Sequence, residues 1–196
     1  MPVTINGDGS IAGLSVGGLG NGGIVDADSL ASNAVTSVKL HNDAVVASKL
    51  PAGTVIKYQH TTSATRTNIT SGTTWTTFTG TQVDFTPTFS NSKLDLTWSF
   101  ALEADQNVNG TGFRIYRESP IGGSSTLLGE TLQHSHWGTG NWTGPGQTVL
   151  NWDDSPGVTT PVRYYVQGYR ETGNALYINM GQDSLGITMR VLEIKQ

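Results

Sequence analysis

The segment from Lys93 to Glu103 alternates between large apolar side chains and small or polar ones. A period of two is typical of a β-strand that buries one face and exposes the other. Shorter runs of the same kind follow from Phe113 to Tyr116, from Val162 to Gln167 and from Leu176 to Met180. We therefore predict an all-β domain whose longest strand presents five side chains to the core: Leu94, Leu96, Trp98, Phe100 and Leu102.

The last segment, from Gly186 to Ile194, begins with the same alternation but changes phase. It is apolar at Ile187, Met189 and Val191, and then at Leu192 and Ile194. A β-bulge or burial on both faces would explain the change. Turn signals separate the alternating runs, and Asp153-Asp154-Ser155-Pro156 fits a turn because Asp side chains bond nearby amides before a proline. Eight or so short strands without a convincing amphipathic helix indicate a β-sandwich or jelly roll.

A different pattern precedes this domain, because residues 24–50 repeat every ten residues. Apolar pairs at Ile24-Val25, Ala34-Val35 and Ala44-Val45 alternate with Ser29-Leu30, Lys39-Leu40 and Lys49-Leu50. Each unit has too few apolar side chains to offset the cost of ordering its backbone, which is about 1–2 kcal/mol per residue. The repeat therefore predicts a shaft built from several copies of the chain. Short strands are expected, although residues 43–50 could instead form one short helix ended by Pro51.

Composition divides the chain in the same way. All 16 aromatic residues lie between Tyr58 and Tyr177, and eight glycines fall within residues 7–23. Pro51-Ala52-Gly53 ends the repeat. We predict a glycine-rich anchor segment over residues 1–23, a shaft over 24–52 and a β-sandwich knob over 53–196.

Several function classes are disfavoured. The net charge of −4 and the lack of a basic run argue against nucleic-acid binding. The first residues lack a signal-peptide pattern, and no 18-residue apolar segment exists, so we expect no membrane insertion. The absence of cysteine rules out disulfides and thiolate metal sites, and fits assembly in a reducing cytoplasm.

Short motifs occur in a characteristic order along nearly the full chain. They are Thr4-Ile5-Asn6-Gly7, Ile11-Ala12-Gly13-Leu14, the decapeptides ending in Lys-Leu, Asn91-Ser92-Lys93-Leu94, Gly112-Phe113-Arg114-Ile115-Tyr116-Arg117, Arg163-Tyr164-Tyr165-Val166-Gln167 and Ile187-Thr188-Met189-Arg190-Val191-Leu192-Glu193-Ile194. In this order the motifs resemble those of tailed-bacteriophage fibre proteins. The resemblance implies a homotrimer in the virion, with its N-terminus held by tail or baseplate proteins and its C-terminal domain facing the host.

The segment from His134 to Gly146 has no counterpart in that resemblance and is the candidate receptor site. It interleaves glycines with His134, His136, Trp137, Asn141 and Trp142. Tryptophan offers a flat apolar face for a sugar ring, while Asn and His can bond its hydroxyls. Loops on a rigid sandwich often carry recognition, so we expect this loop to bind a host surface polysaccharide. The alternative is structural: Trp137 and Trp142 would cover a sheet edge or fill the trimer interface.

Two chemical hypotheses are weaker. In an extended segment His134 and His136 would point to the same side and could bind a divalent cation, but we favour histidines without a metal. A glycosidase would need two of Glu103, Asp105, Asp153 and Asp154 about 5–9.5 Å apart across a cleft. Nucleophile and phosphate-loop motifs are absent as well, so we expect no enzyme and no cofactor. The competing function is purely structural, as a virion decoration or as a baseplate or head fibre whose knob contacts other virion proteins.

Overall fold

The computed structural model describes residues 4–5, 11–12, 36, 44–69, 74–104, 109–136, 146–172, 176–178 and 186–196. The chain divides into two compact units, Met1–Val46 and Ala47–Gln196. In the first unit, β1 (Thr4–Ile5) pairs with β2 (Ile11–Ala12) in antiparallel fashion. Apart from Thr36, residues 24–43 lie outside the described part of the chain, so the conformation of the repeat stays a prediction.

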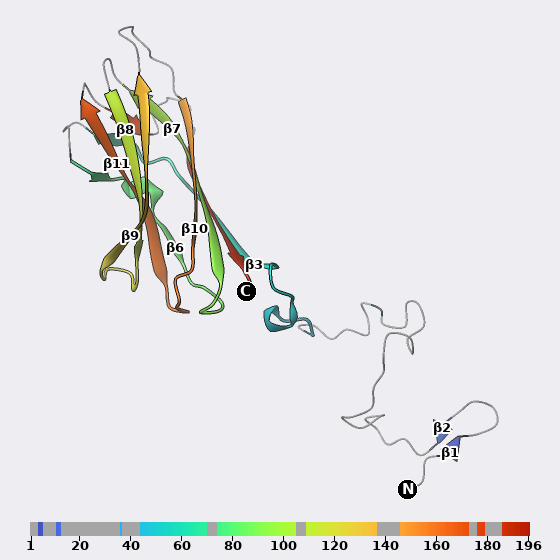
Figure 1. Ribbon diagram of the computed structural model, residues 1–196. Coiled ribbons are helices and arrows are strands. Elements are labelled where there is room, and N and C mark those ends of the chain that lie inside the picture. Colours follow the sequence, from blue (N-terminus) through green and yellow to red (C-terminus); the bar gives the residue numbers. More distant parts are fainter. Residues whose placement is uncertain are drawn as a thin grey trace. The chain divides into compact units, whose positions relative to one another are not determined.

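The second unit, here called the C-terminal unit, is built almost wholly from strands (Figure 1). Two short 3-10 helices, η3 (Ala47–Lys49) and η4 (Thr79–Thr81), accompany them. The strands are β3 (Val55–Ser63), β4 (Thr67–Ile69), β5 (Thr76–Thr77), β6 (Val83–Phe85), β7 (Lys93–Ala104), β8 (Asn109–Glu118), β9 (Ser125–His136), β10 (Gly146–Asp154), β11 (Val162–Thr172), β12 (Leu176–Ile178) and β13 (Ile187–Ile194). No helix in the described residues is long and apolar enough to cross a membrane.

These strands form two antiparallel sheets. In the first sheet, β7 pairs with β10 along one edge and with β13 and then β12 along the other, while β3 and β4 pair with β13 and β12. In the second sheet, β8 lies between β9 and β11, and β6 and β5 pair with the far edge of β11. The strand orders β3-β13-β7-β10 and β6-β11-β8-β9 are those of a jelly roll. The predicted all-β sandwich is therefore confirmed.

The core lies between the sheets and contains every side chain that the alternation of β7 assigned to it. Trp98 is 1% exposed, and its neighbours on the same face of β7 are also buried. Its indole N–H donates to the Thr81 carbonyl oxygen at 2.9 Å, which satisfies its one polar atom. Beside it, the rings of Phe100 and Phe113 pack edge to face with centroids 5.6 Å apart.

The phase change in β13 has a different cause from the two that we considered. The alternation continues to the end of the strand: Glu193 takes the next core-facing position, whereas Leu192 and Ile194 are only partly buried on the other face. A register shift against β3 occurs between Glu193 and Ile194, but it does not turn Leu192 inward. The sequence pattern breaks because a charged residue occupies a core position.

Glu193 is 0% exposed, so its carboxylate must find partners within the protein. The segment that connects β6 to β7 supplies them. The carboxylate accepts hydrogen bonds from the Thr88 backbone N–H at 2.6 Å, the Thr88 hydroxyl at 2.8 Å, the Phe89 backbone N–H at 3.2 Å and the Ser92 hydroxyl at 2.6 Å. This single side chain thus fixes the β6–β7 connection against the last strand.

The C-terminal end of the chain also fixes the residues that precede β3. Lys195 donates its backbone N–H to the Thr54 carbonyl at 2.9 Å and accepts from the Gly53 N–H at 2.7 Å. Its Nζ donates to the carbonyl of Ser48 at 2.8 Å and to that of Leu50. Gly53 has φ of 86°, which favours glycine at this turn. Residues 47–52, which the sequence pattern placed in the shaft, belong to the C-terminal unit.

Candidate functional site

The predicted receptor loop connects β9 to β10. His134 and His136 lie in β9, but the structure does not describe their side chains. Trp137, Asn141 and Trp142 lie outside the described residues. Binding of a sugar by these five residues therefore stays a prediction.

Strand pairing does locate the two ends of this loop. His136 pairs with Asn109, Thr172 pairs with the same residue, and Gly146 pairs with Leu102. The end of β9 and the start of β10 therefore lie at the end of the sandwich where β7 ends and β8 begins (Figure 1). Val55, where the chain enters the sandwich, pairs with Ile194 at the opposite end. The loop thus joins strands at the end of the sandwich opposite to Val55 and Ile194.

The pairing also bears on the proposed histidine pair. Across β8 and β9, the register shifts between Asn109 and Thr111, which are opposite His136 and Gln133. Three steps along β9 therefore correspond to two along β8, as at a β-bulge. This register shift falls within the segment of β9 that contains His134 and His136. Within the described residues, no group of three or more His, Asp or Glu side chains could hold a metal ion.

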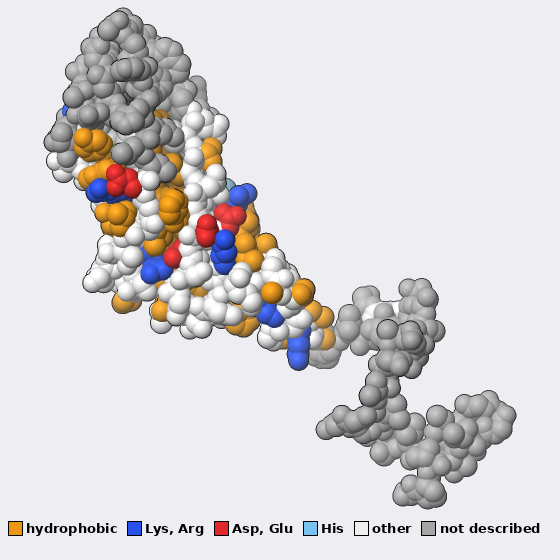
Figure 2. All heavy atoms as spheres, in the orientation of Figure 1, with side chains coloured by type: hydrophobic (Ala, Val, Ile, Leu, Met, Phe, Trp, Pro, Cys, Tyr) orange, Lys and Arg blue, Asp and Glu red, His pale blue; other side chains and the backbone are white. Residues whose placement is uncertain are grey.

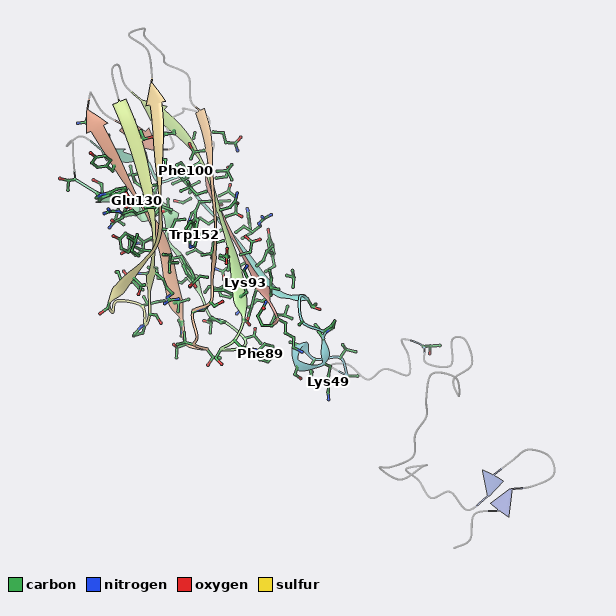
Figure 3. All side chains as sticks on the ribbon, viewed as in Figure 1. Lys49, Phe89, Lys93, Phe100, Glu130 and Trp152 are labelled. Atoms are coloured by element: carbon green, nitrogen blue, oxygen red, sulfur yellow. The ribbon has the colours of Figure 1, made fainter. Side chains whose placement is uncertain are left out.

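A pocket of about 280 Å³ lies on the outer face of the first sheet, toward the end that carries Val55 and Ile194. Three neighbouring strands line it: β7, β10 and β13. The lining residues are Lys93, Asp95, Asn151, Trp152, Asp153 and Ile194. Figure 2 shows acidic and basic side chains close together on this face, in the region where Figure 3 labels Lys93.

Register explains the charges of this pocket. Asp95 and Asp153 are direct partners on antiparallel strands, which brings two like charges to about 5 Å between Cβ atoms. Lys93 offsets the repulsion, because its Nζ lies 3.1 Å from Asp153 Oδ2. Asp95 has no ion pair with any residue that the structure describes. One carboxylate therefore remains available to a ligand.

Trp152 is held in place from the opposite sheet. A Cβ added to Gly129 of β9 would lie 2.2 Å from Cη2 of the Trp152 ring, so only glycine allows this close approach. The ring thus spans the side of the sandwich between β10 and β9. Trp152 pairs with the core residue Leu96 and packs against the core, so its ring lies on the inner face of the sheet, behind the pocket.

Apolar and aromatic side chains continue the pocket surface across the sheet. Leu192 of β13 pairs with Asp95 on one side and with Tyr58 of β3 on the other. Tyr58 is 58% exposed, and its ring stacks on that of His60 with centroids 6.5 Å apart and planes at 12°. A strip of polar, aliphatic and aromatic groups therefore crosses three strands at one level.

Sequence reasoning missed this pocket. Lys93 and Asp95 stand at the polar positions of the alternating run in β7, which was the available signal. The prediction of a turn at Asp153-Asp154 was wrong, since both residues end strand β10 and the connection to β11 begins at Ser155. Gly157 in this connection has φ of 74°. With β10 unrecognised, nothing in the sequence brought Asn151 and Asp153 next to Lys93 and Asp95.

Asp154, another candidate catalytic acid, joins the two sheets instead. Arg117 of β8 donates from Nη1 to both carboxylate oxygens, at 2.9 and 2.7 Å. The Tyr164 hydroxyl of β11 donates to Oδ2 at 2.8 Å. Since β10 belongs to the other sheet, this cluster connects both layers near the pocket. Asp105 lies outside the described residues, and the structure does not describe the Glu103 side chain.

The hydrogen bonds and burial of Tyr164 in this cluster can be tested through the stability of the protein at alkaline pH. Its burial, reinforced by the negative charge and hydrogen bond of Asp154, raises the pKa of Tyr164 well above the ordinary 10.0. The folded state therefore keeps the phenol proton where the unfolded chain loses it. The Tyr164 contribution is fully present below pH 10.0 and falls as the pH rises above it. Above pH 10.0 we expect the free energy of unfolding of the parent, measured with urea, to fall by up to about 1.4 kcal/mol per pH unit because of Tyr164. In Tyr164→Phe this part of the decrease should be absent. An identical alkaline slope in both proteins would contradict this assignment.

The outer face of the second sheet carries a different surface, rich in stacked rings. Tyr116 and Tyr165 stack with centroids 5.5 Å apart at 10°. The Arg114 guanidinium lies 3.9 Å from the centroid of the Trp75 ring and pairs with Glu130 at 2.7 Å. Figure 3 labels Glu130 on this side of the sandwich. Aromatic and arginine side chains are enriched where proteins contact one another.

Comparison with known proteins gives no family for this chain. No protein-family model matches it, and no curated protein matches it in sequence. Among solved structures, the VP2 subviral particle of infectious bursal disease virus is similar with a TM-score of 0.38 and 11% identity, over 71% of this chain and 38% of that one. The Eiger TNF of S. frugiperda gives a TM-score of 0.36 and 9% identity, over 67% of this chain and 91% of that one. The chain thus spans well under half of the VP2 chain, and the strand order alone supports the jelly roll.

Proposed function

We propose that this chain is the subunit of a homotrimeric tailed-bacteriophage fibre, whose C-terminal unit adsorbs to a glycan on the host cell surface. The observation that carries the proposal is the position of the β9–β10 loop. Its strand ends lie at the end of the sandwich remote from Val55, where the N-terminal segment joins. A recognition loop on a fibre must lie away from the particle, and a loop at the end of the sandwich opposite to Val55 is consistent with attachment through the residues that precede β3.

The N-terminal part of the chain fits the shaft and anchor of such a fibre. Its decapeptide repeat has no aromatic residue and few apolar side chains per unit. In a trimer, Val35, Leu40 and Val45 would each meet symmetry copies of themselves along the axis. The glycine-rich residues 1–23 would be held by tail or baseplate proteins. The particle would then be assembled in the host cytoplasm, where the lack of cysteine has no cost.

A second candidate function is structural decoration of the virion. The partly exposed side chains of Trp75, Arg114 and Tyr116 favour it, because aromatic and arginine side chains suit contact with another virion protein. Adsorption separates the two candidates. Saturable binding of the full-length protein to host cells supports the receptor function, while a lack of binding together with retention on purified virions supports decoration.

The loop itself is tested by Trp137→Ala combined with Trp142→Ala. We expect the double variant to lose attachment to host cells, since each lost ring removes about 0.5–1.5 kcal/mol of sugar contact and three knobs bind at once. Fluorescently labelled full-length protein on host cells measures attachment. The variant should still sediment as a trimer and melt within a few degrees of the parent. A much lower melting temperature would show that the tryptophans are structural, and undiminished attachment would exclude the loop.

A further inference from the structure

The pocket on the first sheet has the two kinds of surface that a sugar ring needs. Ile194 and Leu192, which lie two residues apart on the same face of β13, supply aliphatic contact. Tyr58 stands in line with Leu192 and Asp95, and its ring is largely exposed. The C–H face of a pyranose packs on such apolar and aromatic groups.

The polar side chains of the pocket match the hydroxyls of a saccharide. Asp95 and Asp153 accept hydrogen bonds, Lys93 donates them, and Asn151 does both. All four come from adjacent strands, so the sheet fixes their spacing. The volume of about 280 Å³ is close to the lower end of ligand pockets, which is about 300 Å³. A single polar ring, or the end of a short chain of them, suits this size.

The net charge of the pocket determines which classes of sugar it can bind. Lys93 is paired with Asp153 at 3.1 Å, which leaves the Asp95 carboxylate as the net charge of the pocket. A carboxylated or phosphorylated sugar would meet a like charge here, whereas an amine or a hydroxyl would meet an acceptor.

We propose that this pocket is a second saccharide-binding site, specific for a neutral or amine-bearing sugar ring. It goes beyond the receptor loop, because it lies toward the opposite end of the sheet and uses none of the loop residues. In this site Asp95 and Asn151 bond the ring hydroxyls or amine, and the aliphatic surface of Ile194 and Leu192 contacts its C–H face.

The test measures binding of the full-length protein to three immobilised probes: N-acetylated chitotetraose, its deacetylated amine form and tetragalacturonate. We expect the first two to be retained and the third to be rejected. Asp95→Ala combined with Asn151→Ala should weaken retention about tenfold, because it removes one charged and one neutral hydrogen-bonding group. The matched control is Thr62→Ala combined with Gln147→Ala, which removes polar groups from the same sheet face outside the pocket and should bind as the parent does.

Three results would overturn the proposal: retention of tetragalacturonate at the same strength, retention of none of the probes, or equal losses in the pocket variant and the control. Melting temperatures within a few degrees of the parent establish that both variants are folded. The Trp137→Ala and Trp142→Ala variant should retain the chitotetraose probes, since the pocket is intact in it. Its attachment to host cells, measured separately, reports on the receptor loop, so either site can fail without the other.

Discussion

Alanine in place of Trp98 is expected to lower the free energy of unfolding of the C-terminal unit by about 3–5 kcal/mol, a large part of the stability of an ordinary domain. The side chain is 1% exposed at the middle of β7, in contact with both layers of the core. The substitution creates a cavity and leaves the Thr81 carbonyl, now bonded at 2.9 Å, without its donor. Urea unfolding followed by circular dichroism measures the loss.

Trp98→Phe is the matched control, because it keeps most of the ring but removes the indole N–H. We expect it to lie between the parent and the alanine variant, with a loss of about 1–3 kcal/mol for the unpaired carbonyl. A fall of only a degree or two in the melting temperature of the alanine variant would show that Trp98 does not carry the core.

Glu193→Ala should destabilise the C-terminal unit to a similar degree, by about 3–5 kcal/mol, because an unsatisfied buried donor costs about 1–3 kcal/mol and several donors lose their acceptor. The carboxylate is fully buried and accepts four hydrogen bonds from Thr88, Phe89 and Ser92. Its removal leaves these donors unsatisfied inside the protein and frees the β6–β7 connection from β13. Urea unfolding gives the energy, and hydrogen exchange at the amides of Thr88 and Phe89 shows whether the connection is released.

Glu193→Gln separates charge from shape. The amide fills the same space and keeps one oxygen, but it presents an N–H₂ group where the carboxylate accepts. We expect this variant to be less destabilised than Glu193→Ala, with faster exchange at the same two amides. Parental stability in both variants would mean that the hydrogen bonds to Glu193 contribute nothing to folding.

The sequence predicted those strands in which the alternation of apolar and polar residues is complete within one continuous segment. The run from Lys93 to Glu103 carries its alternation within itself, and the structure buries the predicted face. At Glu193 the pattern failed because a charged residue occupies a core position. Its burial is possible only because the β6–β7 connection, which is distant in sequence, supplies hydrogen-bond donors. At Asp153-Asp154 the local turn propensity was overridden, because pairing with β7 extends β10 to Asp154.

The two candidate sites also differ in whether their residues are adjacent in the sequence or are brought together by strand pairing. The glycines, histidines and tryptophans of residues 134–146 are adjacent in sequence, so composition alone drew attention to them. The pocket exists only because Asp95 pairs with Asp153 and Leu192 pairs with Asp95. Such a juxtaposition follows from strand order, which no single segment encodes.

The place of β13 in its sheet has a consequence for biosynthesis. This strand lies between β3 and β7, although it follows both of them in the sequence. Until residues 187–194 have emerged, β3 and β7 have no partner between them, and each presents unsatisfied backbone groups of the kind that promote aggregation. The first sheet can therefore close only after residues 187–194 have been synthesised, and a chain truncated before Ile187 lacks the strand that joins β3 to β7.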